Sequence, residues 1–373
     1  MDALMLPLNW QRVRLGDIGK PCMCKRVMKH QTTRYGEIPF YKIGTFGNTA
    51  DAFISKKLFL EYKTKYSFPK KGDILISASG TIGRAVIYDG KPAYFQDSNI
   101  VWIDNDETLV KNDFLFYAYS NVKWNTEHTT ILRLYNDNFR NTLIPLPPLN
   151  EQIAIANILS GLDRYLCALD ALILKKESVK KALSFELLSQ RKRLKGFNQA
   201  WQRVRLGDIA NYLTSNLSAE QITQQGKIKV YDVNNFIGYT DTTFISDKPY
   251  ISIVKDGSVG RVRILPPKTN ILSTMGALIA NHRTTTEFLF YLLSNFDFKN
   301  FTSGSIIPHI YFKDYKEKTI FLPPLNEQSA IANILSALDN EITSLKNKKR
   351  QFENIKKALN HDLMSVKIRV LEK

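Results

Sequence analysis

The sequence predicts a mixed α/β (α+β) protein with two similar globular domains and two long helices that pair as a coiled coil. Three observations lead to this fold class: two blocks of sequence recur along the chain, a heptad pattern follows the second block in each copy, and the regions between the blocks are rich in short apolar runs and turn residues. At 373 residues, the chain is long enough for two or three domains that each bury a core.

An internal repeat divides the chain into two copies. The nine residues 10–18 recur unchanged as residues 201–209, and the 18 residues 146–163 recur as residues 322–339 with two differences. The sequence between the blocks diverges, and the first copy carries the longer insert. A repeated frame around unlike interiors predicts one shared assembly task and two different recognition tasks.

The two inserts, about 19–145 and 210–321, are expected to form domains of short strands and irregular loops. Apolar runs at 73–77, 85–88 and 99–103 are typical of strands, and 113–121 is expected to be a short helix. The Gly-rich segment 80–84 has a counterpart at 257–261. The run Lys-Gly-Asp-Ile-Leu at 71–75, however, has only Tyr-Ile-Ser-Ile-Val near its place in the second insert, at 250–254.

Each copy ends in a predicted long helix. Apolar or long side chains recur at alternating spacings of four and three from Ile155 to Leu194 and from Ile331 to Val370. Paired prolines precede each helix, and Asn150 and Asn326 are expected to cap the first turn. A helix of about 45 residues would be roughly 65 Å long. The seam is narrow and long, which favours pairing of the two helices over two helices lying separately on globular domains.

The charge balance favours a polyanionic partner. Lys and Arg number 52 against 35 Asp and Glu, a net charge of +17, although a merely basic or ribosome-associated protein would also fit. The basic run 175–195 is expected to be a solvated helix face with some long-range attraction for a duplex. Neither a signal peptide nor an apolar stretch of membrane-spanning length is evident, so a soluble, cytoplasmic protein is expected.

Catalytic and metal-binding motifs are absent from the sequence. It has no Asn/Asp-Pro-Pro-Tyr/Phe motif, no phosphate-binding Gly-x-x-x-x-Gly-Lys-Ser/Thr loop and no His-Glu-x-x-His motif. Its three cysteines, Cys22, Cys24 and Cys167, fit neither a disulfide framework nor a zinc site. We therefore expect no catalysis and no bound cofactor or metal in this chain. Two alternatives stay open: a stand-alone enzyme that cleaves or methylates DNA at specific sites, and a protein scaffold that binds no DNA.

The order of these blocks resembles that of the specificity subunit of type I restriction–modification enzymes, over nearly the whole chain. The segments that carry the resemblance are the W-x-x-V-x-L-G-D openings at Trp10 and Trp201, the Gly-rich turns at Gly80 and Gly257, and Leu-Pro-Pro-Leu-Asn-Glu-Gln heading a long helix at Leu146 and Leu322. The resemblance implies target recognition domains at 1–145 and 196–321, a central long helix at 146–195 and a distal long helix at 322–373.

The resemblance also implies how such a chain works. Each target recognition domain reads one half of a split, asymmetric site in double-stranded DNA, and the long helices pair antiparallel and set the spacer between the halves. Near-two-fold symmetry lets two modification subunits dock, which bind S-adenosylmethionine and methylate adenine N6. Restriction subunits, the motor and nuclease that use ATP and Mg²⁺, join through them, so the specificity chain itself holds no cofactor.

The candidate DNA-contacting residues are those whose side chains can present donors or acceptors to base edges. Gly80, Gly83, Gly257 and Gly260 are expected to let the backbone approach the duplex closely. The alternative is that Gly-x-x-Gly-Arg is a common turn whose arginine contacts only a phosphate or a carboxylate. The candidates in the first insert are Ser77, Ser79, Thr81, Arg84, Gln96, Ser98, Asn99, Arg133 and Asn136; those in the second are Lys255, Ser258, Arg261, Ser273, Thr274, Ser303, Ser305, His309 and Tyr311.

Overall fold

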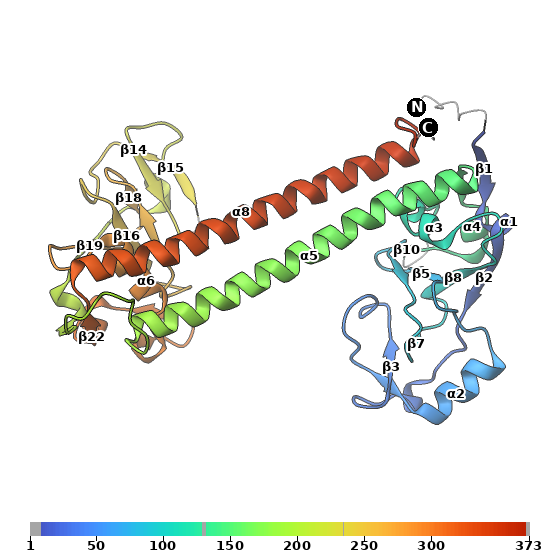
Figure 1. Cartoon of the computed structure of the whole chain (residues 1–373), viewed down its shortest axis with the longest axis horizontal. Helices are drawn as coiled ribbons and strands as arrows, with labels where there is room; N and C mark the ends of the chain where they lie inside the picture. Colours follow the sequence, from blue (N-terminus) through green and yellow to red (C-terminus); the bar gives the residue numbers. More distant parts are fainter. Residues whose placement is uncertain (1–8, 129–131, 234, 371–373) are drawn as a thin grey trace. The chain divides into compact units, whose positions relative to one another are not determined.

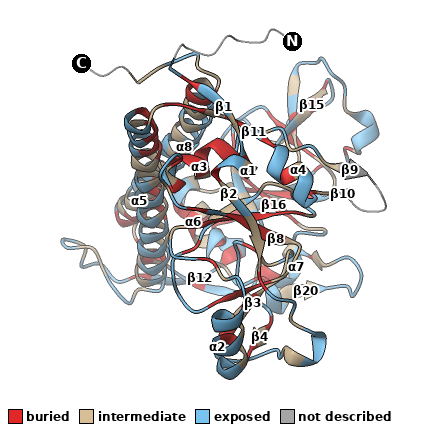
Figure 2. Ribbon diagram, turned by 90° about the vertical axis from the view of Figure 1, so that its right-hand side faces the viewer, coloured by how far each residue is buried: buried red, intermediate tan, exposed pale blue. Residues whose placement is uncertain are grey.

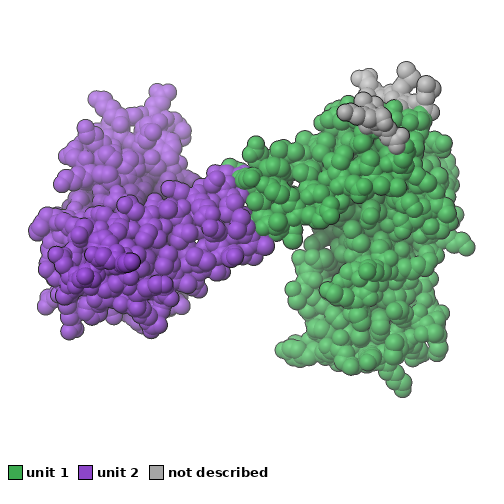
Figure 3. All heavy atoms as spheres, viewed as in Figure 1, with its two compact units in different colours: residues 1–169, 348–373 green, residues 170–347 purple. Residues whose placement is uncertain are grey.

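The computed structural model describes residues 9–128, 132–233 and 235–370, which form two compact units (Figures 1 and 3). Unit 1 comprises residues 1–169 and 348–373, and unit 2 comprises residues 170–347. The first eight residues of the predicted domain 1–145 and the last three of the predicted helix 322–373 lie outside the described residues. Each unit therefore contains an insert from one copy together with a helix end from the other copy.

The elements of unit 1 follow the chain from the first repeated block. They are β1 (Gln11–Arg14), α1 (Leu15–Ile18), β2 (Gly19–Met23), β3 (Ile38–Tyr41), β4 (Phe53–Ile54), α2 (Lys56–Lys65), β5 (Ile74–Ser77), β6 (Ala85–Ile87), β7 (Tyr94–Phe95), β8 (Ile100–Asn105), α3 (Asn112–Tyr119), β9 (Glu127–His128), β10 (Leu132–Arg133), α4 (Asn136–Asn141), β11 (Leu143–Leu146) and the first part of α5 (Leu149–Leu188).

Unit 2 repeats the order of the strands from the second repeated block, without an α-helix matching α1 or α2 among its described residues. Its elements are β12 (Gln202–Arg205), β13 (Ala210–Thr214), β14 (Ile228–Tyr231), β15 (Phe236–Thr240), β16 (Tyr250–Val254), β17 (Val262–Leu265), β18 (Asn270–Ile271), β19 (Met275–Ala280), α6 (Thr286–Ser294), β20 (Thr302–Ser303), β21 (His309–Ile310), α7 (Phe312–Tyr315), β22 (Thr319–Leu322) and the first part of α8 (Leu325–Met364). The strands and the short helix predicted in the first insert are confirmed as β5, β6, β8 and α3.

The main sheet has the same topology in both units. Its order is β2-β8-β5-β6 in unit 1 and β13-β19-β16-β17 in unit 2, with antiparallel neighbours throughout. Each unit also has a smaller sheet, in the order β4-β3-β7 in unit 1 and β15-β14-β18 in unit 2. Each of these sheets contains one antiparallel and one parallel pairing of strands. Since β5 and β16 occupy the same place, the segments 71–75 and 250–254, which differ in sequence, precede equivalent loops.

Burial explains why these runs become central strands. All four residues of β5 and all five of β16 are buried, and continuous apolar runs of this kind fit a sheet covered on both faces. Helix α3 covers the sheet of unit 1 with the buried Phe114 and Tyr117, and α6 places Phe288 and Tyr291 in the same way. The buried residues, red in Figure 2, therefore concentrate in these strands and in the helices that cover them.

The two repeated blocks of each copy meet in space. Strand β1 pairs antiparallel with β11, aligning Gln11 with Leu146, and β12 pairs with β22, aligning Gln202 with Leu322. Each pairing brings the two ends of an insert together directly before its long helix. The insert can thus change in length and sequence without moving the helix start, which accounts for the conserved frame around divergent interiors.

Helices α5 and α8 are each 40 residues long and are unbroken. They are shorter than expected, because the chain turns into a left-handed conformation at Gln190 (φ 63°) and Val366 (φ 62°). They also start earlier: the carbonyl of Pro148 accepts from the backbone N–H of Gln152 at 3.0 Å, so Asn150 lies inside the first turn and does not precede it. Asn326 lies likewise inside the first turn of α8, so neither asparagine occupies the N-cap position. Each still binds a free backbone N–H of the first turn, because Asn150 Oδ1 accepts from Glu151 N–H and Asn326 Oδ1 from Glu327 N–H, both at 2.9 Å.

The predicted helix pairing is confirmed and is antiparallel in each unit (Figure 1). In unit 1, Asp163 contacts Lys356 and the ring of Tyr165 lies 4.7 Å from that of Phe352. In unit 2, Lys176 contacts Glu341 at 2.7 Å and Lys346 contacts Glu177 at 2.6 Å. Lys176 and Lys356, which lie at heptad positions, therefore meet carboxylates on the opposite helix instead of an apolar partner.

Each unit is completed by the helix end of the other copy. Leu363 and Met364, from the second copy, are buried in the unit 1 core with Trp10, and Leu187, from the first copy, is buried in unit 2 with Trp201. These leucines hold equivalent places in the two copies. The core of either insert domain is thus closed by side chains that the same copy does not supply.

Buried carboxylates reinforce this exchange. Glu151 accepts from Trp10 Nε1 at 3.0 Å and from Arg369 Nη2 at 3.0 Å. In unit 2, Glu327 accepts from Trp201 Nε1 at 2.9 Å. Its second partner is Arg193, whose guanidinium donates from Nη2 at 2.6 Å and from Nε at 3.2 Å. The tryptophan and glutamate of each network come from one copy and the arginine from the other.

Candidate nucleic-acid interface

The loops that follow β5 and β16 are closed by the same backbone hydrogen bonds. In unit 1 the Ser77 N–H donates to the Arg84 carbonyl at 3.0 Å, and the Gly83 N–H donates to the Ser77 carbonyl at 2.9 Å. In unit 2 the Val254 N–H donates to the Arg261 carbonyl and the Gly260 N–H donates to the Val254 carbonyl, both at 2.9 Å. The weak sequence similarity between the two Gly-rich segments therefore reflects one conserved loop.

The glycines of these loops have two different roles. A Cβ atom on Gly83 would lie 2.0 Å from Trp124 Nε1, and one on Gly260 would lie 2.6 Å from Phe298 Cδ2. Packing against an aromatic ring requires glycine at these two positions, whether or not a duplex approaches them. Gly257 has nothing within 4 Å and Gly80 has only Ile43 at 3.8 Å, so at these two positions the backbone faces open space.

The fold brings three separately predicted segments together in each unit. Next to the unit 1 loop, the Leu134 N–H donates to the Ala78 carbonyl at 2.8 Å and the Ala78 N–H donates to the Asn99 carbonyl at 2.8 Å. Unit 2 has backbone hydrogen bonds in the same pattern: the Ile310 N–H donates to the Lys255 carbonyl at 2.9 Å, and the Lys255 N–H donates to the Thr274 carbonyl at 3.1 Å. We define the site of each unit as the loop plus these two flanking segments.

The side chains carried by this common backbone differ between the units. Isolated bridges pair Ser79 with Arg133 in unit 1 and Asp256 with His309 in unit 2. Ser79 of unit 1 therefore corresponds to Asp256 of unit 2, and Arg133 corresponds to His309. In unit 2, His309 Nδ1 lies 2.7 Å from Asp256 Oδ1. Asp256 was missed by sequence reasoning, because a single acid in a basic segment gave no signal without its histidine partner.

In unit 1 the equivalent polar groups are arranged differently. Ser79 Oγ donates to Asn99 Oδ1 at 2.9 Å, and Arg133 Nη2 donates to the Ser98 carbonyl at 3.0 Å. Ser98 has a φ of 55°, an uncommon left-handed conformation for a residue other than glycine. The Arg133 guanidinium also lies 5.8 Å from the centre of the Tyr135 ring, so it is held from two sides.

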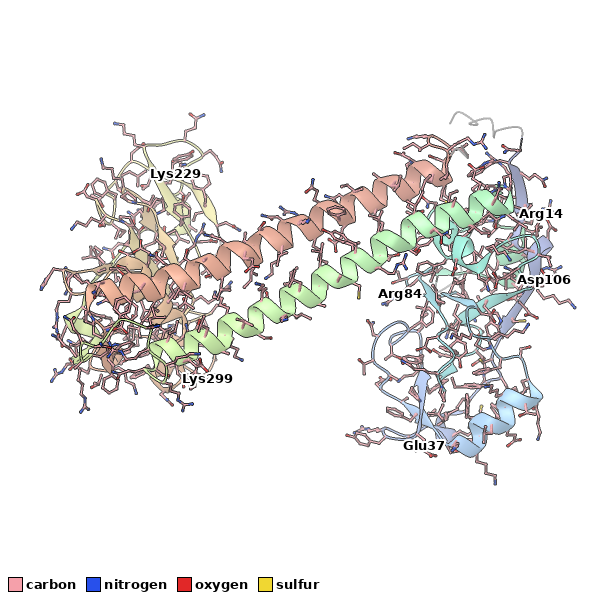
Figure 4. The ribbon with its side chains drawn as sticks, in the orientation of Figure 1. Arg14, Glu37, Arg84, Asp106, Lys229 and Lys299 are labelled. Atoms are coloured by element: carbon pink, nitrogen blue, oxygen red, sulfur yellow. The ribbon has the colours of Figure 1, made fainter. Side chains whose placement is uncertain are left out.

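Most of the predicted residues are accessible in the structure. The exposed residues are Thr81, Arg84, Asn136, Ser258, Arg261, Thr274, Ser303, Ser305 and Tyr311; the half-buried ones are Ser79, Gln96, Ser98, Asn99, Arg133, Lys255, Ser273 and His309. Figure 4 labels Arg84, whose Nη2 donates to the carbonyl of Gly47 at 3.4 Å. Each unit thus presents arginine and hydroxyl groups around one loop, with amide groups added in unit 1 and Lys255 and His309 added in unit 2.

Two predicted residues act on the loops themselves. Ser77 is only 2% exposed, and its Oγ accepts from the Arg84 N–H at 3.0 Å and donates to the Thr81 carbonyl. Gln96 Oε1 accepts from the Ile43 N–H at 2.9 Å, which fixes the neighbouring segment. Their hydrogen bonds make these side chains supports of the site.

A second repeated feature is a cleft between each insert helix and the long helix of the other copy. In unit 1, a cleft of about 930 Å³ is lined by Tyr117, Ser120 and Asn121 of the insert and by Lys356 and Lys357 of α8. In unit 2, a cleft of about 370 Å³ has the same five residue types at equivalent positions: Tyr291, Ser294, Asn295, Lys180 and Lys181.

The wall of each cleft contains a shared cluster of polar groups. The Tyr117 hydroxyl donates to Asp163 Oδ2 at 2.7 Å, and Asp163 also contacts Lys356. Tyr291, Asp339 and Lys180 make the same cluster in unit 2, with a Tyr291–Asp339 distance of 2.8 Å. Burial and the adjacent carboxylate raise the pKa of both tyrosines, so each hydroxyl stays protonated and donates.

Within the described ranges, no cluster of three or more His, Cys, Asp or Glu side chains could hold a metal ion. Helices in the same part of the chain are all too short or too polar to cross a membrane. The candidate side chains on this surface offer hydrogen-bond donors and acceptors and positive charge.

Comparison with known proteins gives consistent similarities. A family model described as "Type I restriction modification DNA specificity domain" matches twice, at residues 7–177 and 198–354. A chain from Haemophilus influenzae, named as a type I restriction enzyme specificity subunit, is 64% identical over 152 residues; this match covers 40% of each chain. The specificity subunit of the type I restriction enzyme MjaVIII from Methanocaldococcus jannaschii is 26% identical over 99% of this chain and 95% of its own length.

A solved structure has the same fold. The type I restriction–modification S subunit from M. genitalium superimposes with a TM-score of 0.64 at 20% identity, covering 96% of this chain and 98% of the other. At this level of identity the similarity concerns the fold alone.

Proposed function

Since this chain belongs to the type I restriction–modification DNA specificity family, whose specificity subunit is the non-catalytic part of the enzyme, we propose that its two inserts read the two unlike halves of one split DNA site. The functional division proposed is the one expected from the sequence, with recognition domains at 1–145 and 196–321 and helices at 146–195 and 322–373. The domain of unit 1 reads one half-site and that of unit 2 reads the other.

One observation carries this proposal: the sites of the two units share their backbone hydrogen bonds but not their side chains. A conserved backbone presents both sites to the same kind of ligand, a DNA groove, in the same way. Arg133 in one site and His309 in the other offer different donors, and Asn99 and Thr274 differ likewise, so the two bind different base edges. The net charge of +17 supplies the attraction for phosphates.

The twin clefts support the proposal that two modification subunits dock, one on each unit. Because a repeated surface binds repeated copies of a partner, residues shared by both copies are the ones expected at a shared interface. The five cleft residues are of identical types in the two copies, unlike the side chains of the reading sites. S-adenosylmethionine, and the ATP and Mg²⁺ used by restriction subunits, would be bound by these partners.

The paired helices support the proposal that the spacer between half-sites has a set length. Lys356–Asp163 and Tyr165–Phe352 in unit 1, and Lys176–Glu341 in unit 2, fix the register of α5 against α8. A pair of helices locked by such contacts resists sliding, and duplex half-sites must be met at fixed intervals along the DNA.

The test is a duplication of one insert inside the same chain. Residues 210–321 are replaced by a second copy of residues 19–145, and the variant is expressed with its modification subunit in a host whose methylated adenines are mapped by single-molecule sequencing. We expect the unmodified chain to produce one split motif with unlike halves, and the variant to produce a motif whose two halves are the same.

The outcomes separate the candidate functions. A variant motif unchanged from the original, or changed in the half retained from the first insert, would contradict the assignment of one insert to one half-site. Methylation or cleavage by the purified chain alone would favour a stand-alone enzyme. Absence of duplex binding even with the modification subunit would favour a scaffold that does not bind DNA.

A smaller change should relax a single base pair of the motif. Arg133→Ala removes the guanidinium held by the Ser98 carbonyl, and one good arginine–guanine contact is worth about 1–3 kcal/mol of discrimination. We expect one position of the unit 1 half-site to become degenerate in the methylation map while the other half stays unchanged. Arg140→Ala, an exposed arginine on α4, is the matched control and should leave the motif intact.

A further inference from the structure

A hairpin in unit 2 exposes two consecutive isoleucines next to the reading site. Between β20 and β21, Ile306 is 92% exposed and Ile307 is 55% exposed. Single exposed apolar residues are common on protein surfaces, but two adjacent ones at the tip of a hairpin are a reason to look for a ligand.

The hairpin is held firmly against the loop of the unit 2 site. The Gly257 N–H donates to the Pro308 carbonyl at 2.8 Å, and the Ile310 N–H donates to the Lys255 carbonyl at 2.9 Å. The turn depends on Gly304, which has a φ of 91° and where a Cβ atom would lie 2.3 Å from the Ile307 carbonyl oxygen. The two isoleucines are therefore presented on a hairpin that is bonded to the loop after β16 through Lys255 and Gly257.

The surroundings of the isoleucines are polar and basic. Residues 298–313 contain no acid, while Lys299 (Figure 4) and Lys313 flank the hairpin. Ser303 and Ser305 are exposed on it, and Asp256, which is bridged to the hairpin, is engaged by His309. A small apolar tip within a rim of hydroxyls and cations matches the major groove, where a thymine methyl group lies between hydrogen-bonding base edges and phosphates.

The internal repeat argues for DNA over a protein partner at this hairpin. The twin clefts carry the same residue types in both copies, as a shared partner requires. When the copies are aligned on His309 and Arg133, which occupy equivalent bridges, residues 303–306 read Ser-Gly-Ser-Ile where 127–130 read Glu-His-Thr-Thr. The hairpin thus changes between the copies as the reading sites do.

We propose that Ile306 and Ile307 contact the C5-methyl group of thymine in the half-site read by unit 2, and so select thymine at that position. The inference rests on the proposed function, because it assumes that unit 2 reads one half of the DNA site. The C5-methyl is the apolar group that thymine displays in the major groove, and a β-branched side chain at a protruding tip can cover it.

The test combines a protein change with the removal of one methyl group from the DNA. The complex of the full chain with its modification subunit is titrated with duplexes in which each thymine of the unit 2 half-site is replaced in turn by deoxyuridine. We expect the unmodified chain to lose about four-fold in affinity at one such position, the value for one buried methylene-sized group. I306S should lose a similar factor on the thymine duplex and show no further loss on deoxyuridine.

Two controls accompany this titration. I87S replaces another exposed isoleucine, 42% exposed in unit 1, and should retain the full sensitivity to deoxyuridine. Deoxyuridine in the half-site read by unit 1 should affect I306S and the unmodified chain equally. Because Ile306 is almost fully exposed, its replacement by serine is not expected to alter folding, which circular dichroism would verify.

The inference is overturned if the unmodified chain binds every deoxyuridine duplex as well as the thymine duplex, or if I306S keeps the full deoxyuridine penalty. Failure of the proposed function is recognised separately, because the complex would then bind no specific motif or the insert duplication would leave the motif unchanged. A complex that binds its motif specifically but ignores the methyl groups contradicts the role of the isoleucines alone.

Discussion

Replacing Leu363 by alanine is expected to destabilise the domain at the opposite end of the sequence, lowering the free energy of unfolding of unit 1 by about 2–5 kcal/mol. Leu363 lies near the C-terminal end of the chain, yet it is 1% exposed in the core that contains Trp10, Leu15 and Phe114. Removing its side chain leaves a cavity that surrounding groups from two copies must collapse to fill. Hydrogen exchange followed by mass spectrometry should show faster exchange in β2, β5 and β8.

Leu187, the equivalent leucine of the first copy, should destabilise unit 2 instead of unit 1 when it is replaced. Leu187→Ala should accelerate exchange in β13, β16 and β19 of unit 2 and leave unit 1 protected, because Leu187 is buried with Trp201 and Leu335. Leu174→Ala, at a position 64% exposed on α5, is the control and should cost well under 1 kcal/mol. If Leu363→Ala weakened unit 2, or affected both units equally, the exchange of helix ends between copies would be contradicted.

Replacing Glu327 by alanine is expected to lower the free energy of unfolding of unit 2 by about 3 kcal/mol. The side chain of Glu327 is fully buried, and its loss leaves the Arg193 guanidinium without a counter-ion and the Trp201 N–H without an acceptor. We place the effect at the low end for a broken buried pair because the Arg193 side chain is 26% exposed and water can reach it. Urea unfolding monitored by circular dichroism, with exchange data to locate the change, measures it.

One further variant separates charge from hydrogen bonding in this network, and a second serves as a surface control. Glu327→Gln keeps an acceptor for the Trp201 N–H and should cost less than the alanine variant. Glu341→Ala removes a carboxylate that is 44% exposed and pairs with Lys176 on the surface, so a change below about 1 kcal/mol is expected. Equal losses from Glu327→Ala and Glu341→Ala would mean that the buried network contributes no more than a surface pair.

The contacts that close each unit are made by residues outside the two inserts. Trp10 with Glu151 and Trp201 with Glu327 lie in the repeated blocks, whereas Arg369 and Arg193 lie beyond the opposite helices. A change in either insert leaves all six of these residues in place. The recognition domains can therefore diverge while the contacts that close each unit stay the same.

The sequence by itself determined the plan of the molecule. Repeats at 10–18 and 201–209, and at 146–163 and 322–339, showed two copies, and the heptad pattern predicted two long paired helices. The main strands and α3 followed from short apolar runs. These features are local or periodic, so each residue's neighbours along the chain specify them. The helix ends were placed less well, because the start at Pro148 and the left-handed turn at Gln190 depend on backbone hydrogen bonds and not on the periodic pattern.

Only the tertiary structure decided which copy completes which core and which candidate residues share a site. Nothing in the sequence links Leu363 to Trp10 or Asp256 to His309, because contacts between distant segments depend on the packing of whole elements. The structure likewise turned Ser77 from a candidate base reader into a support of its loop, and placed Gly83 against Trp124. The physical reason is the same in each case: burial and hydrogen-bond partners are set by what the fold brings close, and residue type alone does not fix them.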